Sequence, residues 1–195
     1  RVALVKDESE VWSDVSLFYM GRGHVIHVKA GSTGTSGSNW SDAFGTLHEA
    51  LEQSIPGDEI WVAAGTYYPI SVANTASVTE DERQQALSLK PGQMIYGGFN
   101  GTEIMRQQRN YATNPTIISG DLSNSGVEQS RSYNLFKLES DDENIINRAT
   151  FVDGLILEQA AQSAMVNKDA SPTVYNTIFR YNNGENGAAV RNEDG

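Results

Sequence analysis

The amino-acid sequence predicts an all-β fold built as a solenoid, and three observations lead to this prediction. First, 18 glycines and many Asn, Ser and Thr residues divide the 195 residues into short apolar runs. Second, these runs are rich in β-branched and aromatic residues, which favour strands. Third, two pairs of segments align with each other, at offsets of 22 and 25 residues, as expected where successive turns of a solenoid stack.

The first 29 residues are expected to form a separate segment of short strands, either the end of a preceding domain or an N-terminal cap. Alternating apolar runs occur at Val2–Val5, Val11–Tyr19 and His24–Val28. The Gly/Ser/Thr-rich stretch 31–38 offers little to bury and is predicted to be a mobile surface loop. Residues 30–195 are assigned to one helix followed by the solenoid.

That helix is predicted at about 41–54. Its apolar residues follow one another at spacings of four, three and four: Trp40, Phe44, Leu47 and Leu51. Asn39 or Ser41 could cap its start, and Pro56 would end it. We expect this helix to cover the apolar end of the solenoid.

Short strands are predicted for the rest of the chain, with no second helix. The runs are Glu59–Ala63, Leu87–Leu89, Met94–Phe99, Thr116–Ser119, Tyr133–Leu138, Thr150–Leu157, Ala164–Val166, Thr173–Phe179 and Ala188–Arg191. The offset of 22 aligns the sixth run with the eighth and places Gly154 opposite Asn176. Both residue types tolerate a left-handed backbone, so we expect a bend at this position in both runs.

The composition argues against several function classes. The formal net charge is −11 and the sequence pI is about 4.6, which disfavours binding to nucleic acid or to anionic lipid. The longest apolar run is Ile60–Ala64, far short of the roughly 20 residues that a membrane helix needs, so no direct membrane insertion is expected. The absence of cysteine removes disulfides, thiolate metal sites and a cysteine nucleophile.

Several blocks of sequence resemble one known family. They are Asn39–Phe44, Pro56–Pro69, Ile95–Glu103, Gln108–Asn110, Asn114–Asp121 and Ser171–Val174. In this order they are similar to the N-terminal part of secreted bacterial right-handed parallel β-helix repeat proteins of the pectate-lyase-like superfold. The resemblance implies a right-handed parallel β-helix that continues in a longer chain beyond Gly195. It also implies a secreted or surface-displayed, adhesin-like protein.

The expected function is therefore non-catalytic. The segment would act as a rigid spacer or as a surface that binds a polysaccharide or a cell-surface protein. The alternative is a polysaccharide lyase or glycoside hydrolase with its site on later coils. The candidates for such chemistry within this chain lie on different predicted strands: Lys168, Arg180, Arg191, Asp153 and Asp169. No catalytic or cofactor-binding residue is assigned.

Metal sites receive little support. His24 and His27 lie three residues apart on a predicted strand, so their side chains point to opposite faces and cannot share a metal ion. The offset of 25 stacks Asp169 on Asp194, and two adjacent carboxylates could bind Ca²⁺. The competing interpretation is a turn cap, because Asp169 precedes Ala170-Ser171-Pro172.

The same offset stacks Asn167 on Asn192 and predicts an asparagine ladder, with both side chains buried or half-buried and bonded to each other or to adjacent backbone. Four tyrosines are candidates for stacking on sugars, with core packing as the alternative: Tyr67, Tyr68, Tyr175 and Tyr181. The glycine-rich run 97–101 is interpreted as a turn rather than a phosphate-binding loop, because no helix follows it.

Overall fold

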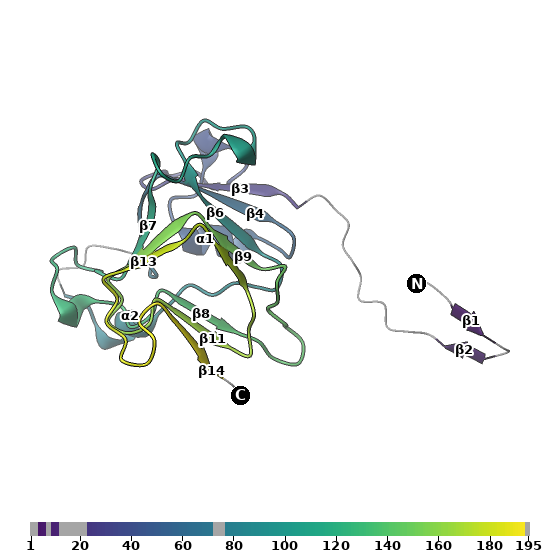
Figure 1. Ribbon diagram of the computed structural model, residues 1–195. Helices are drawn as coiled ribbons and strands as arrows, with labels where there is room; N and C mark the ends of the chain where they lie inside the picture. Colours follow the sequence, from purple (N-terminus) through teal and green to yellow (C-terminus); the bar gives the residue numbers. More distant parts are fainter. Residues whose placement is uncertain (1–3, 7–8, 12–22, 72–76, 194–195) are drawn as a thin grey trace.

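The strands of this chain form three parallel sheets and one antiparallel pair (Figure 1). The structure is a computed structural model that describes residues 4–6, 9–11, 23–71 and 77–193. The antiparallel pair consists of β1 (Leu4–Lys6) and β2 (Ser9–Val11). Most of the predicted run Val11–Tyr19 lies outside the described residues.

The largest sheet has five strands in the order β12–β9–β6–β4–β3. Its members are β3 (Val25–Val28), β4 (Glu59–Ala63), β6 (Met94–Phe99), β9 (Phe151–Asp153) and β12 (Thr173–Tyr175). The four-stranded sheet contains β5 (Gly65–Tyr67), β7 (Thr116–Ser119), β10 (Leu155–Glu158) and β13 (Ile178–Arg180). The three-stranded sheet contains β8 (Phe136–Glu139), β11 (Met165–Lys168) and β14 (Val190–Glu193).

The apolar faces of the three parallel sheets meet in one core. Ile60 from the five-stranded sheet, Ile118 from the four-stranded sheet and Phe136 from the three-stranded sheet belong to the same buried cluster, and none of them is exposed to solvent. Figure 1 shows the sheets on different sides of this shared interior. Burial of these side chains is the main favourable term for folding.

Most of the predicted strands and their local register are confirmed, but the run Leu87–Leu89 forms only an isolated bridge between Leu87 and Phe136. β6 and β7 have the predicted bounds. The aligned runs pair in parallel, with Val152 beside Val174 and Ile156 beside Ile178. Both runs break where the backbone is left-handed, at Gly154 (φ 77°) and Asn176 (φ 44°). The offset of 22 residues was therefore a correct guide to the pairing of neighbouring strands.

The predicted fold class is nevertheless wrong for the residues that the structure describes. They form three small parallel sheets of three to five strands, two helices are present, the helix content is 13%, and no solenoid or right-handed parallel β-helix is found. The connections explain the difference. The chain passes through β5 and the helix α2 (Glu80–Gln84) between β4 and β6, through β7 and β8 between β6 and β9, and through β10 and β11 between β9 and β12. These connections differ greatly in length, so alignments of single strand pairs did not imply a constant repeat.

The helical segment also differs from the prediction. A 3₁₀ turn, η1 (Trp40–Asp42), is separated from a short helix, α1 (Leu47–Gln53). Asn39 accepts hydrogen bonds from backbone N–H groups of η1, whereas Thr46 forms a capping box with Glu49 at the start of α1. Between them Phe44 forms a parallel bridge with Val28, which holds this stretch in extended backbone. α1 contacts β3 and buries Leu47 to 1% exposure.

The prediction missed the second helix, α2 (Glu80–Gln84). It begins with a capping box formed by Thr79 and Glu82. Two further 3₁₀ turns are η2 (Arg106–Gln108) and η3 (Glu128–Ser130).

A buried amide joins α1 to the five-stranded sheet. Gln93 directly precedes β6 and is fully buried. Its Nε2 lies 3.2 Å from both the Leu51 and Ser54 carbonyl oxygens, at the end of α1, and 2.5 Å from Ser54 Oγ. Its Oε1 accepts the Lys90 N–H at 2.7 Å. Gln93 therefore satisfies carbonyl groups that the end of a helix leaves without intrahelical partners.

The predicted contact between two stacked asparagines is confirmed, but its surroundings differ. Asn167 lies beside Asn192 in the parallel pair β11–β14, and its Nδ2 donates to Asn192 Oδ1 at 3.0 Å. Asn167 is buried, with 7% exposure, whereas Asn192 is exposed. Asn167 Oδ1 is buried and has no hydrogen-bond partner among the described residues. Among the described residues the ladder therefore consists of a single hydrogen bond, and its acceptor, Asn192, is exposed to solvent.

Tyr67 contributes to the core rather than to a ligand site. It is 4% exposed, its hydroxyl donates to the Ala63 carbonyl at 3.0 Å, and the same oxygen accepts the Ala30 N–H at 3.0 Å. Burial raises the pKa of Tyr67 from 10.0 to about 12. The phenol thereby ties the end of β4 to the chain that follows β3.

Replacing Leu47 with Ala should lower the free energy of unfolding by ~2–4 kcal/mol, because the substitution leaves a cavity between α1 and the core. Chemical denaturation monitored by circular dichroism measures this change. Ile104→Ala serves as the control, since Ile104 is 83% exposed. Equal stabilities of the two variants would contradict the assigned packing of α1.

Replacing Gln93 with Leu should cost at least ~2 kcal/mol, because it leaves buried carbonyl and N–H groups without partners. Asn167→Leu is the matched comparison and should cost less than ~1 kcal/mol. That substitution removes one hydrogen bond to an exposed partner and also removes a buried, unsatisfied oxygen. Denaturant titration of both variants tests the contrast, and a larger loss in Asn167→Leu would refute it.

The free energy of unfolding should fall at alkaline pH, because the buried phenol of Tyr67 loses its proton there. Its folded-state pKa lies above the unfolded value, so its contribution is fully present below pH 10 and is lost as the pH rises toward about 12. A shift of this size corresponds to about 3 kcal/mol. Tyr67→Phe should therefore show a weaker loss of stability than the parent between these pH values in denaturant titrations. A parallel decline of both proteins would show that other groups cause it.

Candidate functional site

The outer face of the five-stranded sheet carries a group of aromatic and charged side chains in mutual contact. Side chains alternate between the two faces of a strand. The register places Ile26, Ile60, Ile95, Val152 and Val174 in one row, of which the first four are buried in the core. The adjacent row points away from the core and is called here the outer row: His27, Trp61, Tyr96, Asp153 and Tyr175.

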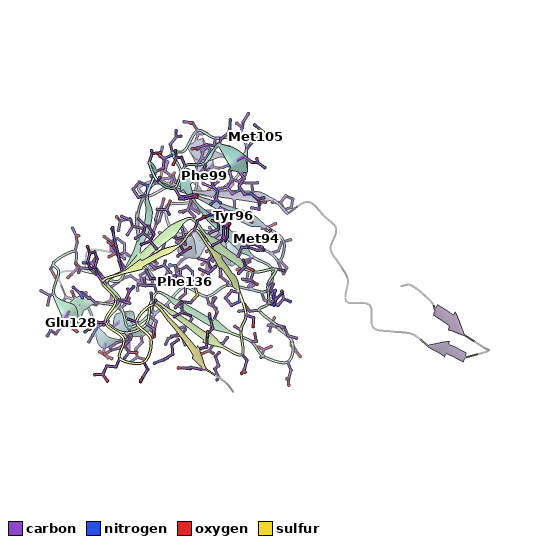
Figure 2. All side chains as sticks on the ribbon, viewed as in Figure 1. Met94, Tyr96, Phe99, Met105, Glu128 and Phe136 are labelled. Atoms are coloured by element: carbon purple, nitrogen blue, oxygen red, sulfur yellow. The ribbon has the colours of Figure 1, made fainter. Side chains whose placement is uncertain are left out.

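One half of the outer row is covered by aromatic rings. Phe99 stacks on Trp61 with ring centroids 4.7 Å apart, and Trp40 meets His27 edge-on at 4.5 Å. Figure 2 labels Met94, Tyr96 and Phe99, which follow one another along β6. Burial lowers the pKa of His27 and raises that of Tyr96. This half is an apolar cluster rather than an accessible surface.

The connection between β6 and β7 covers the middle of the row, and Gly98 allows it to approach. Gly98 has φ 95°, and a Cβ there would lie 2.7 Å from the backbone nitrogen of Tyr111. The Asn110 N–H donates to the Gly98 carbonyl at 2.7 Å. A Cβ at Gly97 would lie 2.5 Å from the carbonyl oxygen of Gly154, which follows the neighbouring strand β9. A side chain at Gly98 would push away the segment that carries Arg109 and Tyr111, whereas one at Gly97 would displace the backbone at Gly154.

The turn after β6 does not offer a phosphate-binding loop. The Glu103 carboxylate accepts backbone N–H groups of Asn100, Gly101 and Thr102 at 2.7–3.1 Å. Burial raises the pKa of Glu103, but these hydrogen bonds outweigh burial and place the pKa below its ordinary value. The chain's own carboxylate thus occupies the N–H groups, in agreement with the predicted turn.

Two arginines from the covering segment form ion pairs above the row. Arg106 Nη1 lies 2.6 Å from Glu59 Oε1, and Glu59 Oε2 accepts the Trp61 indole N–H at 2.7 Å. Arg109 Nη2 lies 2.6 Å from Asp153 Oδ2. The two guanidinium groups lie 4.6 and 5.2 Å from the Tyr96 ring centroid, within the range of cation–π attraction.

The accessible part of this face lies around Asp153. Asn176 Nδ2 donates to Asp153 Oδ1 at 3.0 Å, and the Tyr111 hydroxyl donates to Asn176 Oδ1 at 3.3 Å. Tyr175 is the register partner of Asp153 on β12 and is 63% exposed, while Tyr111 is 45% exposed. These five residues are called here the binding patch: Arg109, Tyr111, Asp153, Tyr175 and Asn176. Together they present aromatic faces beside hydroxyl and amide groups.

The four candidate tyrosines do not gather at one site. Tyr175 belongs to the binding patch. Tyr67 is buried, and it lines a cavity of about 220 Å³ together with the half-buried Tyr68, whose pKa is raised by burial and by the charge of Asp121. Tyr181 is 73% exposed, follows β13 of a different sheet and lies under the guanidinium of Arg180. Of the four, Tyr175 is the one whose register partner is Asp153 of the binding patch.

Among the described residues, no arrangement of ligands supports the calcium hypothesis. Asp169 is exposed and has a left-handed backbone (φ 51°), and Asp194 lies outside the described residues. Asp169 lines a cavity of about 530 Å³ together with Asn167, Asn192 and Glu193. Among the residues described, no group of three or more His, Asp or Glu side chains could hold a metal ion. The pairing of Asp169 with Asp194 stays a prediction.

The structure does not bring the candidate residues for lyase or hydrolase chemistry together. Lys168 and Arg191 lie on the three-stranded sheet, Arg180 on the four-stranded sheet and Asp153 on the five-stranded sheet. Three of these groups are engaged in separate ion pairs, because Arg180 pairs with Glu158, Arg191 with Glu193 and Asp153 with Arg109.

Sequence reasoning missed Tyr111, Arg109 and Asn176 as members of a site. Asn176 was noticed as a bend but not as the amide that joins Asp153 to Tyr111. The offset of 22 residues already placed Tyr175 beside Asp153, so it could have identified that pair. The approach of Arg109 and Tyr111 depends on the fold of the β6–β7 connection, which no sequence spacing predicts.

Comparison with known proteins adds no assignment. No helix in the described ranges is long and apolar enough to cross a membrane. A scan against protein-family models, a search of curated proteins and a search of solved structures each found no match to this chain.

Proposed function

We propose that this chain is a non-catalytic glycan-binding unit of a secreted or surface-displayed protein, and that the binding patch is its ligand contact. The observation that carries the proposal is the combination of two exposed tyrosines with a hydrogen-bonded amide and carboxylate, Asn176 and Asp153. The extracellular location follows from the sequence resemblance alone.

The chemistry of the patch suits a sugar. A pyranose ring has an apolar C–H face and a rim of hydroxyl groups. Aromatic rings such as those of Tyr111 and Tyr175 provide an apolar contact area together with a polar hydroxyl. A few fixed polar groups beside an aromatic surface are what a small-molecule site needs for orientation. Asp153 and Asn176 supply such groups, because each is held by hydrogen bonds within the protein.

Binding is favoured over catalysis because the carboxylates of the outer face are already engaged. The Glu59 carboxylate accepts hydrogen bonds from Arg106 and from the Trp61 indole. The Asp153 carboxylate accepts hydrogen bonds from Arg109 and Asn176. A general acid or base needs an oxygen that can exchange a proton with the substrate. The two carboxylates instead accept hydrogen bonds from groups of the protein itself. The lyase or hydrolase alternative therefore draws no support from this face.

Replacing Tyr175 or Tyr111 with Ala should weaken glycan binding about 5- to 30-fold, as expected for the loss of one aromatic contact worth ~1–2 kcal/mol. Affinity is measured by titration calorimetry with an oligosaccharide selected from a glycan array. Tyr181→Ala is the matched control, since Tyr181 is also an exposed tyrosine but lies outside the patch. Equal losses in all three variants, or release of shortened or unsaturated sugars, would refute the proposal.

A further inference from the structure

We propose that the binding patch selects neutral sugars over uronic acids, an inference that rests on the proposed glycan-binding function. The observation is that the two arginines of the covering segment, Arg106 and Arg109, are each paired with a carboxylate. Arg109 is 13% exposed at its side chain and directs its guanidinium to Asp153 Oδ2 at 2.6 Å, the Gly97 carbonyl at 3.1 Å and the Asp153 carbonyl at 3.4 Å. Arg106 pairs with Glu59 at 2.6 Å.

The exposed residues of the binding patch are neutral. They present the phenol groups of Tyr111 and Tyr175 and the amide of Asn176. Phenol and amide groups can each donate and accept hydrogen bonds. A sugar hydroxyl does the same, so it can match either role. A uronate carboxylate can only accept, and it gains most from a guanidinium with free N–H groups.

A uronate would have to compete with Asp153 for Arg109. The Asp153 side chain is 10% exposed, so removing its arginine would leave a largely buried carboxylate without its counter-charge. Breaking such a pair is strongly unfavourable. The net charge of −11 adds a longer-range repulsion of polyanions that weakens with salt. A neutral sugar meets neither obstacle.

The test uses hexasaccharides of equal length: cello-, xylo- and mannohexaose against hexagalacturonate and hexamannuronate. Each is titrated into the parent protein at 20 and 200 mM NaCl. The proposal predicts that at least one neutral probe binds at least about tenfold more tightly than either uronate. Its affinity should change less than about twofold with salt, because no ion pair forms on binding. Tighter binding of a uronate that weakens with salt would overturn the selectivity.

Variants separate this inference from the proposed function. Asn176→Gly keeps the left-handed backbone but removes the side-chain amide. It should lower the affinity for the neutral probe, as Tyr175→Ala does. Asp153→Asn releases Arg109 and should raise uronate affinity, with a new salt dependence. If uronates bind best and Tyr175→Ala still abolishes their binding, the selectivity is wrong and the glycan site stands. If neither these probes nor an array of neutral and acidic glycans gives binding that depends on Tyr175, the proposed function fails as well.

Discussion

The parallel register of the five-stranded sheet is the constraint on which both the core and the candidate site depend. It aligns Ile26, Ile60 and Ile95 on one face and His27, Trp61 and Tyr96 on the other. A shift of one residue would exchange the two faces and place a histidine, an indole and a phenol where the isoleucines pack. Burying the histidine, indole and phenol in the core would be far less favourable in free energy than burying the three isoleucines, and this difference fixes the register. The same choice determines which residues form the outer row.

The site also depends on how closely the β6–β7 connection can approach the sheet. Gly98 leaves room for it, and the Asn110–Gly98 hydrogen bond fixes its position. Arg109 then reaches Asp153, which in turn aligns Asn176 and Tyr111. Each contact is modest alone, but every polar atom that this network buries needs a partner. A patch assembled in this way has side chains in place before a ligand arrives, which reduces the entropy lost on binding.

The sequence was informative where short-range patterns decide the outcome. β6 and β7 were identified by composition and alternation, and the bends at Gly154 and Asn176 by residue type. α2 could have been found, because Thr79 and Glu82 have the spacing of a capping box. The predicted start of α1 was wrong because Asn39 and Thr46 both resemble helix caps, and the bridge between Phe44 and Val28 keeps the intervening stretch extended. The fold class was wrong because two strand alignments were extended to a repeat that the connections do not follow. The patch lay beyond prediction, since it joins residues from β9, β12 and an irregular connection.

The parallel pairing of all strands in the three larger sheets has a consequence for how the chain reaches its native state. No parallel pair can form through a tight hairpin, so each strand must find a partner that lies far away in the sequence. Chains dominated by such contacts fold slowly, because loop closure costs entropy before native contacts offset it. The capping of α1 by Gln93 follows the same rule, since the helix end is satisfied only after the chain leading into β6 has docked. During this interval strand edges and apolar faces are open to other molecules, which makes intermolecular association a competing process whose rate rises with protein concentration.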